Sequence, residues 1–233
     1  MYALLFLLVG LGGLFLGSGY LVDGAKRIAS MMKVSQTLIG LTIISIGTSI
    51  PEIMTNFFSG LKIRFGTEAS GIALGTNVGS DITQITFILG LTSLLGVILA
   101  TKKILHRDGL MVLFGILLLF LFGLSDGTIT ALEGTIMLIL YLLYLYHIGS
   151  DEDVLKKAKE ELNSIGDEGK IKDYVSNGVL ILFGFGILFL ATDIVVESAI
   201  TLADQWGVAQ SFIGVLIVGV GTGLPELSTS IRA

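Results

Sequence analysis

The chain of 233 residues is 53% hydrophobic and only 14% charged, with a mean hydropathy of +0.89 and a formal net charge of −5. A soluble domain carries about a quarter charged residues, so this composition excludes an ordinary soluble domain and predicts an all-α polytopic membrane protein. The absence of cysteine excludes cysteine-ligated metal sites.

Seven apolar segments are long enough to cross a bilayer, which takes about 20 residues. They are expected near residues 2–19, 36–62, 70–100, 109–124, 128–147, 176–203 and 210–233. The first has no basic leader and no cleavage site, so it is predicted to be a retained helix and not a signal peptide. Its glycines Gly10, Gly13 and Gly17 are predicted to provide space for close helix packing.

Basic residues are concentrated in alternate connections between the expected spans. Eleven lysines and arginines follow the first, third and fifth spans, whereas the other connections carry only Lys62 and Arg64. Because Lys and Arg are enriched on the cytoplasmic side, this pattern places the N-terminus outside the cell membrane. Residues 148–175 are then a cytoplasmic loop, in which residues 151–163 are predicted to form a short amphipathic helix.

The two prolines of the chain, Pro51 and Pro225, lie in matching segments of two apolar spans. Residues 47–52 read Gly-Thr-Ser-Ile-Pro-Glu, and residues 221–226 read Gly-Thr-Gly-Leu-Pro-Glu. Proline removes an amide donor and interrupts a helix, and a glutamate inside a bilayer is costly and usually functional. A matched pair of breaks therefore favours an ion site over the alternative of two simple kinks with structural glutamates.

An internal repeat extends beyond these two breaks. A shift of 174 residues aligns residues 22–59 with residues 196–233 without a gap. Five spans separate equivalent points, so the second copy enters the membrane in the opposite direction, as in the inverted repeats of secondary transporters. The expected organisation is a first repeat of five spans in residues 1–147, the loop in residues 148–175, and two spans that begin the second repeat in residues 176–233. The matched pairs include Asp23 with Glu197, Gln36 with Gln210, Gly40 with Gly214, and Thr55 with Thr229.

The side chains at the two breaks are hard oxygen donors. Glu52 and Glu226 supply carboxylates, and Thr48 and Thr222 supply hydroxyls beside carbonyls that the prolines leave free. Oxygen ligands of this kind suit Ca2+ or Na+.

These segments resemble those of the Ca2+/cation antiporter superfamily, which includes sodium/calcium and proton/calcium exchangers. Residues 71–82 are similar to the family's Gly-Asn-x-x-Gly-Ser-Asn signature, and the Gly-Thr-Ser-x-Pro-Glu segment is closer to sodium/calcium exchangers and their prokaryotic relatives. The resemblance implies that competing cations share Glu52 and Glu226. It also implies that the first helices of the two repeats, near residues 2–32 and 176–203, slide against the rest of the protein.

The remaining ligands that the resemblance implies come from both repeats. They are oxygens of Thr48 and Thr222, the hydroxyl of Ser49, and a polar side chain at either Thr76 or Asn77. Ser49 has Gly223 as its counterpart, so one hydroxyl that the family supplies is absent.

Further acidic residues lie within the expected spans, among them Asp81, Asp193 and Glu197. Three roles stay open for Asp81: a third carboxylate of the site, a proton site, or a residue that holds the helix break together. Asp193 and Glu197 lie near the outer end of the sixth span and are expected to be structural or to line a vestibule.

Family members have ten or so helices, whereas about seven are expected in this chain. A missing C-terminal segment or a further chain is therefore expected to complete the second repeat.

The function expected on these grounds is secondary active antiport of Ca2+ against Na+ by alternating access, with the cation held between Glu52 and Glu226. A proton/calcium exchanger is the alternative, and a cation channel or a non-transporting membrane subunit remains open from other classes. An enzyme is not expected, because the chain has no His-Glu-x-x-His motif and both histidines lie outside the apolar centres. The expected partners are the transported ions and the lipid bilayer, with no cofactor and no nucleic acid.

Overall fold

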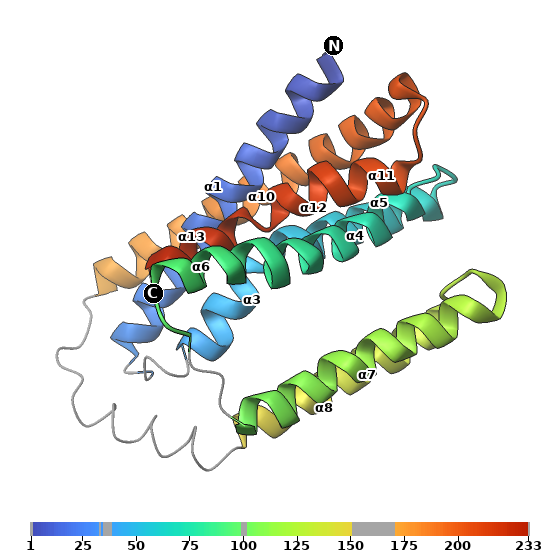
Figure 1. Cartoon of the computed structure of the whole chain (residues 1–233). Helices are drawn as coiled ribbons and strands as arrows, with labels where there is room; N and C mark the ends of the chain where they lie inside the picture. Colours follow the sequence, from blue (N-terminus) through green and yellow to red (C-terminus); the bar gives the residue numbers. More distant parts are fainter. Residues whose placement is uncertain (1, 33, 35–38, 99–101, 151–170, 233) are drawn as a thin grey trace. The chain divides into compact units, whose positions relative to one another are not determined.

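The computed structural model describes residues 2–32, 34, 39–98, 102–150 and 171–232, which are helical almost throughout and contain no β-strand (Figure 1). Six stretches of these residues are long and apolar enough to cross a membrane. The expected all-α membrane fold is therefore confirmed. The amphipathic helix predicted at residues 151–163 lies outside the described residues. The chain forms two compact units, residues 1–96 with 161–233, and residues 97–160.

The span expected near residues 36–62 is present as a series of short pieces. A π-helical turn, η1 (Ile39–Ile44), leads into α3 (Ser45–Thr48), and α4 (Ile50–Arg64) begins after Ser49. Pro51 lies in the first turn of α4, where a helix has no need of the missing amide. This segment is not among the six apolar stretches, although the equally interrupted residues 210–230 are.

Two long helices, α1 (Tyr2–Met31) and α10 (Ile171–Trp206), pack against each other in the first unit. A Cβ added to Gly17 would lie 2.9 Å from the carbonyl oxygen of Gly184, so only glycine permits this contact. Gly10 faces Val195 and Gly24 faces Asn177, which shows that the two helices run antiparallel. The predicted packing role of the first helix's glycines is confirmed, and the equivalent helices of the two repeats have opposite directions.

The second repeat reproduces the interruptions of the first. It consists of α11 (Gln210–Ile213), a π-helical turn η3 (Gly214–Val218), α12 (Gly219–Thr222) and α13 (Leu224–Arg232). The 174-residue shift superimposes α3 on α12 and the start of α4 on the start of α13.

Individual hydrogen bonds repeat with the same shift. Thr55 Oγ1 donates to the Pro51 carbonyl at 2.7 Å, and Thr229 Oγ1 donates to the Pro225 carbonyl at 3.1 Å. The two copies therefore share their backbone conformation as well as their residues.

The third helical segment of the first repeat, residues 70–95, runs along α11, η3 and α12 of the second repeat. It comprises α5 (Ser70–Ile82), a π-helical turn η2 (Thr83–Ile88) and α6 (Leu89–Leu95). A Cβ on Gly79 would lie 2.3 Å from the Val215 carbonyl oxygen, and one on Gly75 would lie 2.7 Å from that of Ser211. This close contact places α5 directly beside the break between α12 and α13.

The second unit contains a helical hairpin. It consists of α7 (Lys102–Asp126) and α8 (Ala131–Gly149), and α8 begins with a capping box between Thr130 and Glu133. Within the hairpin, the Tyr144 hydroxyl donates to Asp108 Oδ1 at 3.0 Å.

Candidate cation site

Glu52 lies in the first turn of α4 and is only 8% exposed. Its Oε1 accepts a hydrogen bond from Ser80 Oγ of α5 at 2.7 Å, and Ser80 Oγ accepts one from Gln84 Nε2 at 2.9 Å. Because an amide NH2 only donates, the single hydroxyl hydrogen of Ser80 is directed at Glu52. The other carboxylate oxygen, Oε2, is buried and has no hydrogen-bond partner among the described residues.

Glu226 occupies the equivalent position in the first turn of α13. Both of its carboxylate oxygens are buried without a hydrogen-bond partner in the described part of the chain. The side chains of Thr48 and Ser49, from the first repeat's break, are close neighbours of this carboxylate. The Thr222 side chain, from the second repeat's break, is in turn a neighbour of Glu52. Each glutamate therefore has at least one hydroxyl of the opposite repeat as a neighbour, and Glu52 also has Ser80 of its own repeat.

The hydroxyls at the two breaks are held in similar ways. Thr48 Oγ1 donates to the Ser45 carbonyl and Thr222 Oγ1 to the Gly219 carbonyl, each at 3.3 Å. Ser49 Oγ also donates to the Ser45 carbonyl, at 3.2 Å. A hydroxyl that donates to the backbone keeps its lone pairs available for a cation.

The glycines of the two motifs, Gly47 and Gly221, allow both breaks to approach α1. A Cβ on Gly47 would lie 2.5 Å from the Val22 side chain, and one on Gly221 would lie 2.6 Å from Leu11. Neither glycine has a positive φ angle. These two glycines therefore provide close helix contact and not a left-handed backbone conformation.

Thr76 and Asn77 lie in different environments on α5. Thr76 is completely buried and its hydroxyl has no hydrogen-bond partner among the described residues. Asn77 is exposed and exchanges two hydrogen bonds of 3.0 Å with the side chain of Asn56. Of the two alternatives, Thr76 shares the buried face of Ser80, one helical turn away.

Asp81 is exposed on α5, unlike its neighbour Ser80. The described residues contain no group of three or more His, Cys, Asp or Glu side chains placed to hold a metal ion together. The structure therefore brings together Glu52, Glu226 and the break hydroxyls, whereas Asp81 is exposed but lies close enough to repel the Glu52 carboxylate.

Sequence reasoning missed Ser80, which donates to Glu52, and Gln84, which donates to Ser80. They follow Thr76 at intervals of four residues, which places all three on one side of a helix. That spacing is the signal by which they are recognisable.

The arrangement is suited to a hard cation and not to covalent chemistry. Buried polar atoms without partners are rare and destabilising unless an ion, water or proton satisfies them. Here the unpartnered atoms are three carboxylate oxygens and one hydroxyl. Carboxylate and hydroxyl oxygens of this kind are ligands for alkali and alkaline-earth cations.

Comparison with known proteins identifies the family. The sequence profile described as "Sodium/calcium exchanger protein" matches residues 2–149 and 176–233. The chain belongs to the sodium/calcium exchanger family. It is accordingly a membrane transporter, a cation antiporter, and not an enzyme.

Individual members of the exchanger family align with almost the whole chain. A putative antiporter, CaxA, of Alkalimonas amylolytica is 31% identical over 236 residues, which cover 98% of this chain and 70% of the relative. The sodium/calcium exchanger MaX1 of Methanosarcina acetivorans is 28% identical in an alignment that covers 98% of this chain and 73% of the relative.

Solved exchanger structures share the fold. The sodium–calcium exchanger NCX_Mj soaked with Na+ and Sr2+ aligns with a TM-score of 0.58 and 29% identity, covering all of this chain and 72% of the exchanger. The sodium/calcium exchanger from Methanococcus jannaschii, in another structure, aligns with a TM-score of 0.53 and 26% identity over 99% of this chain and 72% of that one.

Proposed function

We propose that the protein exchanges Ca2+ for Na+ across the cell membrane by alternating access, and that the cation is held between Glu52 and Glu226. The observation that carries this proposal is the crossed arrangement, in which each glutamate has unpartnered carboxylate oxygens and a hydroxyl side chain of the other repeat as a neighbour. Two carboxylates neutralise one Ca2+, and the same pair can instead take Na+, so the two ions compete for shared charge. Thr48, Ser49, Thr222 and Thr76 are the proposed additional ligands.

Sodium is proposed as the driving ion on the basis of the Gly-Thr-Ser-Ile-Pro-Glu segment at residues 47–52 and the relatives named as sodium/calcium exchangers. Proton exchange is the second candidate. The basic residues further support an orientation with the N-terminus outside and residues 148–175 in the cytoplasm.

Uptake of radiolabelled Ca2+ into Na+-loaded proteoliposomes tests the proposed site. Glu52→Gln and Glu226→Gln are each expected to reduce uptake to the level of empty vesicles, because each removes a charge that the cation needs. Glu68→Gln is the matched control, because Glu68 lies in the connection between α4 and α5 and is fully exposed. Hydrogen bonds from Ser70 lower the pKa of Glu68, so the control also removes a full negative charge. Normal uptake by either site variant would overturn the proposed site.

The same vesicles distinguish the competing mechanisms. An exchanger driven by Na+ takes up Ca2+ only when Na+ is inside, and a proton exchanger does so when a pH gradient replaces the Na+ gradient. A channel passes Ca2+ down its own gradient without any internal counter-ion. Uptake that is independent of internal Na+ would therefore contradict Na+ exchange.

A further inference from the structure

The two repeats share their residues but differ in how their broken helices meet the long helices. The broken helix α13 of the second repeat and the long helix α1 of the first leave a cavity between them. The equivalent pair, α4 of the first repeat and α10 of the second, is in contact. Because the repeats are inverted, these two places lie toward opposite sides of the membrane. We call them the α1–α13 entrance and the α10–α4 entrance.

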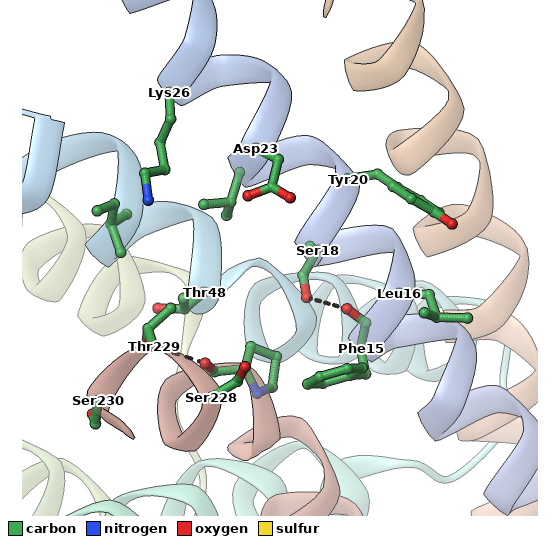
Figure 2. A pocket seen from close by; sticks show the side chains of 14 residues that line it. Phe15, Leu16, Ser18, Tyr20, Asp23, Lys26, Thr48, Ser228, Thr229 and Ser230 are labelled. Atoms are coloured by element: carbon green, nitrogen blue, oxygen red, sulfur yellow. Dashed lines mark hydrogen bonds between the residues drawn. The ribbon is translucent and has the colours of Figure 1, made fainter. Parts of the chain in front are cut away.

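The α1–α13 entrance is open. Its cavity has a volume of about 580 Å³. Asp23 and Lys26 line it from α1, and Thr48 and Thr229 line it from the two breaks (Figure 2). Within the described residues, Asp23 forms no ion pair. Since Thr48 is also a neighbour of Glu226, the cavity extends to the candidate cation site.

Part of the corresponding lining is closed off at the α10–α4 entrance. Thr229 borders the cavity and is partly exposed, whereas its counterpart Thr55 is completely buried. Val22 borders the cavity with 6% exposure, and its counterpart Val196 is completely buried. Phe58 of α4 and Phe189 of α10 meet there edge to face, with ring centroids 5.0 Å apart. The same repeat unit is therefore open at one entrance and closed at the other.

An ion-pair cluster accompanies the closed entrance. Lys62 Nζ, near the end of α4, lies 3.3 Å from Asp193 Oδ1 and also pairs with Glu197 Oε2. The two carboxylates are four residues apart, so they occupy successive turns of one face of α10. Glu197 is the repeat counterpart of Asp23, which lies unpaired in the open cavity. The same position is thus paired where the entrance is closed and unpaired where it is open.

We propose that Lys62 is a latch that holds the α10–α4 entrance closed by pairing with Asp193 and Glu197, and that α10 must leave this lysine for the entrance to open. The proposal rests on the alternating access proposed above. It assigns Lys62 a positioning role, because the lysine acts on the packing of α10 and has no contact with the glutamates of the site. Lys62 is 20% exposed and the two carboxylates are 59% and 68% exposed, so the pairing is weak enough to break in each transport cycle.

Single cysteines provide a direct test, because the chain has none of its own. Val196→Cys reports on the closed entrance and Thr229→Cys, at a partly exposed position that lines the cavity, on the open one. The rate at which a charged, membrane-impermeant thiol reagent modifies each cysteine is measured in detergent, where both entrances are accessible. Adding Lys62→Gln to Val196→Cys is expected to accelerate modification roughly three- to tenfold, the population shift that one or two partly exposed ion pairs support.

Arg64→Gln is the matched control. It removes the same charge two residues away, from an exposed side chain in the last turn of α4, and is expected to leave the modification rate unchanged. Lys62→Arg, which keeps the charge, is expected to remain slow, and the exchange Lys62→Glu with Glu197→Lys is expected to restore protection. Should Lys62→Gln fail to fold, Lys62→Glu alone, expected to be fast, is compared with the charge exchange, expected to be slow; equal rates for these two variants would contradict the latch.

Two further results would overturn the latch: an unchanged rate in Lys62→Gln, or an equal acceleration in Arg64→Gln. Modification rates require no transported ion. Normal Ca2+ uptake by Glu52→Gln would therefore refute the proposed site and leave the latch measurement valid.

Discussion

Thr76 and Asn77 show how adjacent residues of one helix differ in function. The Thr76 hydroxyl is buried and unpartnered, whereas Asn77 is tied to Asn56 at the exposed surface of α4 and α5. An unpartnered buried hydroxyl is destabilising by about 1–3 kcal/mol, and a bound cation would remove that cost.

The concentration dependence of Ca2+ uptake separates these two residues. Thr76→Val keeps the shape of the side chain and removes its oxygen, so the concentration for half-maximal uptake is expected to rise roughly tenfold. Asn77→Ala breaks only the pair with Asn56 and is expected to change that concentration by less than about twofold, as for other exposed contacts. The reverse order of effects would assign the ligand to Asn77.

At the scale of elements, α5 depends on glycine because it lies against the backbone of the second repeat. Gly75 and Gly79 are one turn apart, and both face carbonyl oxygens of residues 211–215. A carbonyl in a helix cannot retreat as a flexible side chain can, so an added methyl group must displace the whole helix. Such a displacement would move Ser80, the next residue, away from Glu52.

Thermal unfolding in detergent tests the contact at Gly79. Gly79→Ala is expected to lower the free energy of unfolding by about 1–3 kcal/mol, because the added methyl group overpacks the contact. Gly90→Ala, in α6 of the same helical stretch, is the control, because a Cβ there has no neighbour within 4 Å. The control is expected to be neutral or to stabilise by about 0.5–1 kcal/mol, since alanine favours a helix more than glycine does. Equal melting temperatures for the two variants would contradict the close contact.

At the scale of the whole molecule, the inverted repeat links orientation to mechanism. The α1–α13 entrance and the α10–α4 entrance lie toward opposite sides, so the side to which each opens follows from the topology of the chain. In the proposed orientation, the C-terminal end of α1, with Lys26 and Arg27, lies in the cytoplasm. The open entrance is then expected to be the cytoplasmic one.

Labelling of single cysteines in right-side-out membrane vesicles tests this orientation. Glu68→Cys, between α4 and α5, is expected to react with an impermeant reagent added outside. Ser150→Cys, which follows α8, is expected to react only after the vesicles are permeabilised. Labelling in the opposite pattern would reverse the assignment of both entrances.

The repeat could be predicted from the sequence because the two copies carry the same residue types at equivalent positions. The prolines, glycines and acidic residues that match over 174 positions also match in their helix breaks and in the hydrogen bonds of Thr55 and Thr229. The π-helical turns at η1 and η3 could not be predicted, because they shift backbone hydrogen bonds and have no distinctive residue type.

The candidate site was predictable in its residues more than in its contacts. Glu52 and Glu226 were evident as acidic residues in apolar spans. That Thr222 lies next to Glu52, however, depends on how the two repeats cross in space. Lys62 was evident only as a basic residue in a connection, and its pairing with α10 depends on tertiary packing. The difference between the two entrances is only partly visible in the sequence: Asp193 has Gly19 as its counterpart and Phe58 has Arg232, but that these residues meet at one entrance depends on tertiary packing.

The hydrogen bond from Ser80 makes the two glutamates differ in the number of carboxylate oxygens that each can offer to a cation. Ser80 occupies one oxygen of Glu52, which leaves that carboxylate able to bind a cation through a single oxygen. Glu226 has both oxygens unoccupied among the described residues and is able to chelate. Calcium accepts carboxylates in either mode, within a shell of about six to eight oxygens. An ion between the repeats would therefore sit off the pseudo-symmetry axis, nearer to the chelating carboxylate of α13.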